Sequence, residues 1–170
     1  GRAGMNECVQ VRPMRLEDIN DVWEVERAAF ANPWSKQAYY NELVLNKSAH
    51  YLVLLVEGKI RGYGGMWVLI DEAHITNVAI HPEVQGRRLG WLLMGTLMVW
   101  ARSLGAERMT LEVRVSNVRA QNLYNKLGFV VTGVRPQYYT DNLEDALIMW
   151  ATLDEGRLSS LFQHEWKDME

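Results

Sequence analysis

The sequence predicts a single domain of the α/β (α+β) class, built on one mixed sheet flanked by helices. Three observations support this prediction. The chain has 170 residues, a usual length for one domain with a full core. Segments with the two-residue period of strands alternate along the chain with segments that have the 3.6-residue period of helices. No internal repeat or low-complexity linker divides the chain.

The N-terminal part of the chain predicts one strand followed by two helices. Residues 8–13 form a short alternating segment that Pro13 ends. Residues 15–30 carry acidic residues in their opening turn and apolar residues at helical spacing, which predicts a helix. A second helix is expected within residues 31–46, with Ser35 as its N-cap.

The period then changes to that of strands. Residues 51–70 predict two strands that are joined by a turn at Glu57-Gly58-Lys59. Residues 73–80 predict a further strand, and its last three residues are continuously apolar. Such a run is typical of a central strand that is covered on both faces.

The best-defined helix follows the strand expected at residues 73–80, and we expect it to end at Gly105. Residues 108–115 then alternate strictly, with Glu112 on the polar face of the predicted strand. Residues 116–129 predict a short helix, and residues 129–153 predict two strands around a Tyr-rich loop. The helix before Gly105 is recognised by seven residues that share one face: Leu89, Leu92, Leu93, Thr96, Leu97, Trp100 and Leu104.

The composition excludes several classes of protein. Hydrophobic residues make up 48% of the chain and charged residues 23%, which is ordinary for a globular protein. The net charge of −3 argues against nucleic acid as a direct partner. One cysteine, Cys8, cannot form a disulfide within the chain. No cysteine and histidine residues have the spacing of metal ligands, so no metal is expected.

The ends of the chain give expectations about its location and domain limits. No apolar run approaches the ~18 residues of a membrane span and no signal peptide is visible, so we expect a cytoplasmic protein without a membrane partner. Residues 1–4 resemble a cloning remnant ahead of a native start at Met5. The domain is expected over residues 5–153. Residues 154–170 are expected to form a tail, either a surface-docked amphipathic helix or a partly mobile segment.

The stretch HPEVQGRRLGWLLM, residues 81–94, places two glycines and two arginines before the best-defined helix. It has two interpretations. The first is a tight turn with solvated arginines. The second is a phosphate site, because a helix N-terminus offers free backbone N–H groups and the positive end of the helix dipole. The stretch has neither the GK[ST] of a P-loop nor the G-x-G-x-x-G of a dinucleotide site.

Three further residues could carry chemistry, although each also has a purely structural interpretation. Glu112 is either a solvated glutamate or a partly buried carboxylate, whose pKa we expect to be raised so that it serves as a base near neutral pH. Tyr124 is either a core residue with its hydroxyl at the rim or a proton donor. Asn117 is either an N-cap or a ligand-binding residue.

The combination of motifs is more specific than any one of them. VAIHPEVQGRRLGWLLM followed by LEVRVSNVRAQNLYNKLGF resembles the GNAT acetyltransferase superfamily. NPWSKQAYYNEL and RPQYYTDNLEDALIMW are similar to its RimI branch, the ribosomal-protein alanine N-acetyltransferases. The resemblance covers residues 9–153. It implies a mostly antiparallel mixed sheet, acetyl-CoA as co-substrate, and transfer to the N-terminal amine, here of alanine, of a small-subunit ribosomal protein.

The resemblance also implies roles for single residues. Glu112 would be the general base, acting through water, and Tyr124 would protonate the departing CoA thiolate. Trp34, Tyr138 and Tyr139 would line the peptide entrance.

The cofactor residues follow from the same resemblance. Asn117 would touch the cofactor arm. The strand residues would pair with the pantetheine arm as an added strand does, and the turn residues would bind the pyrophosphate. The strand residues are Val78, Ala79 and Ile80, and the turn residues are Gly86, Arg87, Arg88, Leu89, Gly90 and Trp91.

One position departs from the family pattern Q-x-x-G-x-G. Gln85, Arg88 and Gly90 occupy its fixed places, so Arg88 replaces the first glycine. The loop can donate its N–H groups if Arg88 keeps a negative φ, and the guanidinium can add a phosphate contact. The substitution bears on cofactor affinity and not on the type of reaction.

Three functions are compatible with the sequence. The first is acetylation of a protein N-terminus. The second is acetylation of lysine side chains or of a small amine. The third is a non-catalytic acyl-CoA-binding module. The presence of both Glu112 and Tyr124 favours catalysis over binding alone, and the RimI resemblance favours a protein N-terminus.

Overall fold

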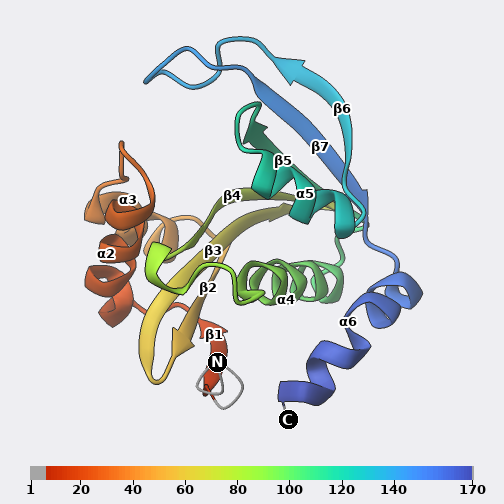
Figure 1. The fold of residues 1–170 in the computed structure, drawn as a ribbon, viewed down its shortest axis with the longest axis horizontal. Coiled ribbons are helices and arrows are strands. Elements are labelled where there is room, and N and C mark those ends of the chain that lie inside the picture. The colour runs from red at the N-terminus through yellow and green to blue at the C-terminus, as the bar shows by residue number, and fades with distance from the viewer. Residues whose placement is uncertain (1–6, 170) are drawn as a thin grey trace.

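The computed structural model describes residues 7–169, and seven of its strands form one sheet (Figure 1). The strands are β1 (Val9–Pro13), β2 (Ala49–Val56), β3 (Lys59–Leu69), β4 (Glu72–Ile80), β5 (Arg108–Arg114), β6 (Val130–Arg135) and β7 (Ala146–Thr152). Their order in the sheet is β1-β2-β3-β4-β5-β7-β6. All neighbours are antiparallel except β4 and β5. The predicted mixed, mostly antiparallel sheet is therefore confirmed.

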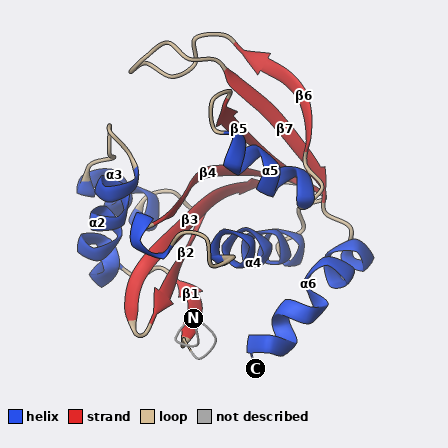
Figure 2. Cartoon of the chain, in the orientation of Figure 1, coloured by secondary structure: helices blue, strands red, loops and turns tan. Residues whose placement is uncertain are grey.

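The helices flank this sheet in two groups, and Figure 2 shows α2 and α3 grouped apart from α4 and α6. The predicted order of strands and helices is confirmed along residues 9–153. None of the helices in residues 7–169 has the length and apolar character that crossing a membrane requires. The helices are α2 (Ile19–Ala29), α3 (Lys36–Val44), α4 (Leu89–Ser103), α5 (Val118–Lys126) and α6 (Glu155–Met169), with short 3-10 turns η1 (Leu16–Asp18) and η2 (Pro82–Val84).

Local signals set the ends of three helices as the sequence predicts. The Ser35 hydroxyl accepts a hydrogen bond from the backbone N–H of Ala38 at 3.1 Å and begins α3. Asn117 Oδ1 likewise accepts from the N–H of Ala120 at 3.1 Å and begins α5. Gly105 has a φ of +98° after the last turn of α4, a conformation that glycine adopts without strain. Asn117 is therefore an N-cap.

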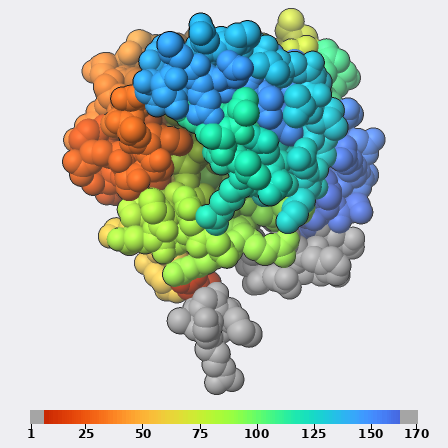
Figure 3. Space-filling view, turned by 45° about the horizontal axis from the view of Figure 1, so that its top comes forward, coloured from red at the N-terminus to blue at the C-terminus, as the bar shows by residue number. Residues whose placement is uncertain are grey.

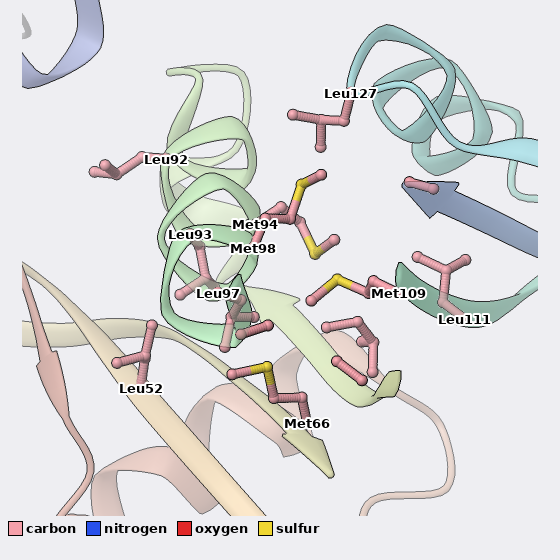
Figure 4. Packing of buried hydrophobic residues seen from close by; sticks show 14 of the residues in the cluster. Leu52, Met66, Leu92, Leu93, Met94, Leu97, Met98, Met109, Leu111 and Leu127 are labelled. Carbon is pink, nitrogen blue, oxygen red and sulfur yellow. The ribbon is translucent and has the colours of Figure 1, made fainter. Parts of the chain in front are cut away.

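Two hydrophobic cores lie on the two faces of the sheet, because successive side chains of a strand point in opposite directions. Leu52 and Leu54 of β2 pack in the core beneath α4, whereas Tyr51 and Val53 pack in the core beneath α2 and α3. Figure 4 shows the α4 core, in which leucines and methionines of the helix meet side chains of β2, β3 and β5.

The C-terminal helix α6 is part of the α4 core over its described side chains, which end at residue 162. Leu158 and Phe162 are buried, and the Phe162 ring lies 5.5 Å from that of Trp91. The Phe162 ring packs so closely on α4 that a Cβ at Gly95 would lie 2.6 Å from it. Of the two alternatives for the tail, the docked amphipathic helix is found. The predicted remnant at residues 1–4 lies outside the described residues.

The sheet opens between β4 and β5. Only three residue pairs join these strands, and the last of them is His74 with Thr110. Beyond this pair, the pairing of β4 with β3 shifts register. Gly65 of β3 pairs with Asn77, whereas the next residue, Met66, pairs with Ile75, so the pairing skips one residue of β4. Figure 1 shows β4 and β5 together at one end and apart at the other. The separation exposes the end of β4 and the middle of β5 to a common opening.

Candidate active site

Two cavities flank the opening between β4 and β5. The α4 groove, about 690 Å³, runs from the end of β4 past the N-terminus of α4 to α5. The tyrosine cavity, about 720 Å³, is lined by the loop between α2 and α3, by β4 and β5, and by the loop between β6 and β7. Figure 3 shows the β6–β7 segment, in blue, beside the orange segment of α2 and α3. Both cavities are lined by Val78, Asn117 and Tyr124, which lie where the two meet.

Most of the residues predicted to bind the cofactor line the α4 groove. Two do not. Ala79 is buried in the core beneath α2, on the other face of β4. Arg87 is exposed and forms an ion pair with Glu7. The residues that do line the groove are Val78, Ile80, Gly86, Arg88, Leu89, Gly90, Trp91 and Asn117.

The N-terminus of α4 opens into this groove. Arg88 is the N-cap residue, and its side chain makes no capping hydrogen bond. The first turn of α4 carries no acidic residue. Its backbone N–H groups have no acceptor within the helix, and they lie at the positive end of the helix dipole. The groove therefore combines apolar walls from β4 and α5 with a terminus that suits an anionic phosphate.

Arg88 has a φ of +60°, in the left-handed region, so the negative φ that was set as a condition for N–H donation by this loop is not found. The carbonyl of Arg88 accepts the hydrogen bond from the N–H of Leu92 at 3.2 Å, which fixes it as the first residue of the helical turn. Glycine, which the family pattern has at this position, adopts a left-handed conformation without strain. A side chain in this conformation costs about 1–2 kcal/mol. The guanidinium lies over the Trp91 ring at 5.6 Å.

Glu112 lines the tyrosine cavity and uses both carboxylate oxygens. Oε2 lies 2.7 Å from Nε2 of His74, and Oε1 accepts from Nε of Arg135 at 3.3 Å. Burial raises the pKa of this carboxyl, but the hydrogen bonds and charges of His74 and Arg135 outweigh burial, so the pKa lies below its ordinary value. The expected raised pKa is wrong, because two partners from β4 and β6 stabilise the carboxylate.

Tyr124 stands between the two cavities. Its ring packs against Phe129 at 5.8 Å, which holds it on the inner face of α5. Burial, with a smaller contribution from the charge of Tyr139, raises the pKa of Tyr124 to about 12. The hydroxyl is therefore protonated at neutral pH and can donate a proton.

The predicted peptide-entrance residues line the tyrosine cavity together with Glu112 and Tyr124. Tyr138 and Tyr139 meet edge to face with their ring centres 5.1 Å apart. The guanidinium of Arg114 lies 3.9 Å from the centre of the Tyr139 ring. Trp34 is fixed from the other side, because its carbonyl accepts from Nε1 of Trp23 at 3.0 Å.

Two residues of this region were not predicted from the sequence. Glu26 is almost fully buried at the wall of the tyrosine cavity, where it accepts from the hydroxyl of Tyr63 and, at 2.8 Å, from the N–H of Trp34. Its position among the apolar residues of a helix face was the available signal. His74 is the other residue. Its contact with Glu112 depends on the pairing of β4 with β5, for which a single sequence carries no signal.

Comparisons with known proteins identify the family of this chain. The family model of the GNAT acetyltransferases matches residues 19–129. A Bacillus subtilis protein, named as a candidate ribosomal protein bS18-alanine N-acetyltransferase, is 50% identical over 89% of this chain and 100% of its own length. The Escherichia coli enzyme named ribosomal protein bS18-alanine N-acetyltransferase is 34% identical over 82% of this chain and 94% of its own.

The fold gives the same result. The crystal structure of the ribosomal-protein-S18-alanine N-acetyltransferase from Escherichia coli superposes with a TM-score of 0.79. It is 30% identical and covers 86% of this chain and 94% of its own. The family match spans the opening between β4 and β5, the turn before α4, and α5. This chain belongs to the GNAT acetyltransferase family.

Proposed function

We propose that this protein transfers the acetyl group of acetyl-CoA to the N-terminal alanine of ribosomal protein bS18, in the cytoplasm. The observation that supports the proposal most is the meeting of the α4 groove and the tyrosine cavity at Val78, Asn117 and Tyr124. A thioester held in the groove and an amine held in the cavity would meet beside Tyr124. The named activity of the two relatives supports the choice of substrate.

The residues of the α4 groove fit acetyl-CoA. The first N–H groups of α4 would hold the pyrophosphate. Val78, Ala79 and Ile80 belong to the part of β4 that does not pair with β5, so their backbone can pair with the pantetheine arm as with an added strand. The backbone there can also stabilise the oxyanion that forms when the amine attacks the thioester.

The N-terminal amine is the acceptor that this site can activate. Its pKa is about 7.7–8.0, against about 10.4 for lysine. Releasing its proton at pH 7 costs about 1–1.4 kcal/mol, whereas lysine costs about 4–5 kcal/mol. Glu112 is ionised at neutral pH and can accept a proton through water. Its lowered pKa makes it a weak base, which suits the amine that is easier to deprotonate.

The chemical step needs one base and one acid. The amine nitrogen forms a bond to the acetyl carbon and loses a proton toward Glu112. The C–S bond then breaks, and the CoA thiolate takes a proton from the Tyr124 hydroxyl. Trp34, Tyr138 and Tyr139 would hold the first residues of the peptide in the tyrosine cavity. No covalent intermediate with the enzyme is required.

The test is acetylation of defined peptides. One peptide carries the bS18 N-terminus with a free alanine, and a matched peptide has its N-terminus blocked and a free lysine. We expect mass spectrometry to find the acetyl group on the alanine amine alone. Acetylation of the lysine peptide at an equal rate would overturn the proposed substrate. Binding of acetyl-CoA without transfer to either peptide, or to any N-terminus in a lysate, would favour a binding module.

A further inference from the structure

His74 contacts the proposed base from outside the tyrosine cavity. It is the last residue of β4 that pairs with β5, and Glu112 lies two residues beyond its partner Thr110 on the same face of β5. Glu112 lines the cavity and its side chain is 10% exposed, whereas His74 does not line the cavity and its side chain is 38% exposed. The pair therefore connects the cavity to solvent at the point where the two strands separate.

The two partners of Glu112, His74 and Arg135, differ in whether they can accept a proton. A guanidinium group has donors and no acceptor, so Arg135 can stabilise the carboxylate but cannot accept a proton. An imidazole can accept one, and its reference pKa of about 6.5 lies closer to that of an N-terminal amine than any carboxylate does. The pKa of Glu112 is lowered, so a proton that reaches it at neutral pH does not stay there.

The surroundings of His74 hold its ring in place for such a transfer. The Trp67 ring of β3 meets it edge-on with the centres 6.3 Å apart. Trp67 is itself fixed, because its Nε1 donates to Glu42 of α3 at 2.7 Å. Facing His74 are therefore Glu112 from β5 and Trp67 from β3, with Arg135 of β6 on the far oxygen of the same carboxylate.

We propose that His74 and Glu112 work as one base, in which Glu112 receives the proton of the substrate amine through water and His74 carries it to solvent. In the tautomer whose Nε2 carries no proton, the proton passes from Oε2 to Nε2 over the 2.7 Å contact and leaves an imidazolium–carboxylate pair. The imidazolium then releases one ring proton to water on its exposed side, and exchange with solvent restores the starting tautomer. His74 is thus a positioning and relay residue, because it does not touch the substrate. The proposal rests on the proposed function of Glu112.

The test compares His74→Gln with wild type by the pH profile of kcat, at saturating acetyl-CoA, on the alanine peptide. Glutamine can still donate a hydrogen bond to Glu112 but cannot take up its proton. We expect kcat to fall about tenfold or more at pH 7 and to approach the wild-type value near pH 9, where the amine arrives without its proton. The peptide KM and the acetyl-CoA Kd should be unchanged. His50→Gln is the matched control. It makes the same substitution at a histidine that packs on Trp100 and lines neither cavity.

The double variant His74→Gln/Glu112→Gln separates a relay from a structural contact. Two residues of one relay are not additive, so the double variant should be no slower than Glu112→Gln alone. A wild-type profile for His74→Gln, a loss of kcat that is equal at all pH values, or losses that multiply in the double variant would each overturn the relay. If wild type acetylates another amine instead of the alanine peptide, the proposed substrate is wrong. The kcat ratios of the variants to wild type, measured on that amine, then still test the relay.

Discussion

The α4 groove and the tyrosine cavity have nearly the same volume but are built in different ways. The groove is formed mainly by one continuous stretch, the end of β4 through the first turn of α4, with α5 as the opposite wall. The tyrosine cavity takes its walls from the α2–α3 loop, β4, β5 and the β6–β7 loop, which are distant in sequence. In the proposed function backbone groups bind the co-substrate in the groove, whereas titratable side chains line the cavity. Substitutions in the cavity should therefore change kcat and its pH dependence, while substitutions in the groove should change cofactor affinity.

Tyr124→Phe should have the largest effect, because Tyr124 belongs to both regions. The variant keeps the ring that packs on Phe129 and removes only the hydroxyl. We expect kcat to fall about 10²-fold or more, the usual scale for loss of a general acid. The loss should persist at every pH, since the hydroxyl acts after the amine has attacked. Steady-state rates from pH 6.5 to 9.5 are the measurement. Tyr138→Phe, at the entrance of the cavity, is the matched control and should lose far less.

Glu112→Gln should have a similar effect at neutral pH and a smaller one at high pH. The amide keeps the size of the side chain but cannot accept a proton, so kcat/KM should fall about 10²-fold at pH 7. Above about pH 9 the substrate is mostly free base and the deficit should shrink. Because the pKa of Glu112 is lowered, its carboxylate form persists well below neutral pH and is lost only in acid. Rates equal to wild type at pH 7 would remove Glu112 from the mechanism.

Gly90→Val tests the groove and should change binding alone. A Cβ at this position would lie 3.2 Å from Cδ2 of Leu123, so Gly90→Ala requires only a small shift of a flexible side chain. The branched side chain of valine would also fill the space beside the helix N-terminus. We expect Gly90→Val to raise the acetyl-CoA Kd at least tenfold, about 1.4 kcal/mol, and Gly90→Ala to raise it much less. Calorimetric titration of both variants gives the answer, and equal Kd values would place the pyrophosphate elsewhere.

Arg88→Gly should have the smallest effect and should stabilise the fold. Glycine relieves the left-handed strain of about 1–2 kcal/mol but costs unfolded-state entropy of about 0.5–1 kcal/mol. The expected net gain is about 0–1.5 kcal/mol, and a gain of about 1 kcal/mol would raise the Tm by about 2–4 °C for a chain of this size. The acetyl-CoA Kd should change by about 1 kcal/mol or less in either direction. Arg87→Gly is the matched control, because φ at Arg87 is not positive and glycine there should lower the Tm.

The sequence predicted the order of elements and the groove more completely than it predicted the cavity. The turn before α4, its terminating Gly105 and the Ser35 cap are local features, so a single sequence carries their signals. The chemistry of Glu112 is not local. Its partners His74 and Arg135 lie 38 and 23 residues away along the chain, and their hydrogen bonds and charges reverse the direction of the pKa shift that burial alone implies.

Arg88 is a case in which the sequence did not predict the backbone conformation. The motif identified its place in the turn, but it did not reveal the positive φ that the folded backbone adopts there. A missing glycine therefore signals a strained residue as well as an altered ligand contact. Glu26 is a third case. Its spacing placed it on the inner face of its helix, but the hydroxyl of Tyr63 and the N–H of Trp34 that satisfy it come from β3 and from the following loop.

The short pairing of β4 with β5 has a consequence for the motions of the sheet. Between residues 75 and 80, the amides of β4 that point toward β5 have no partner strand, so they should exchange hydrogen with solvent faster than the amides bonded to β3. Acetyl-CoA bound along this edge would act as the absent strand and slow their exchange. At a concentration 100 times its Kd, the ligand would also add about 2.7 kcal/mol to the free energy of unfolding. In the proposed binding mode, the enzyme without ligand has an incomplete sheet that its co-substrate would complete in every turnover.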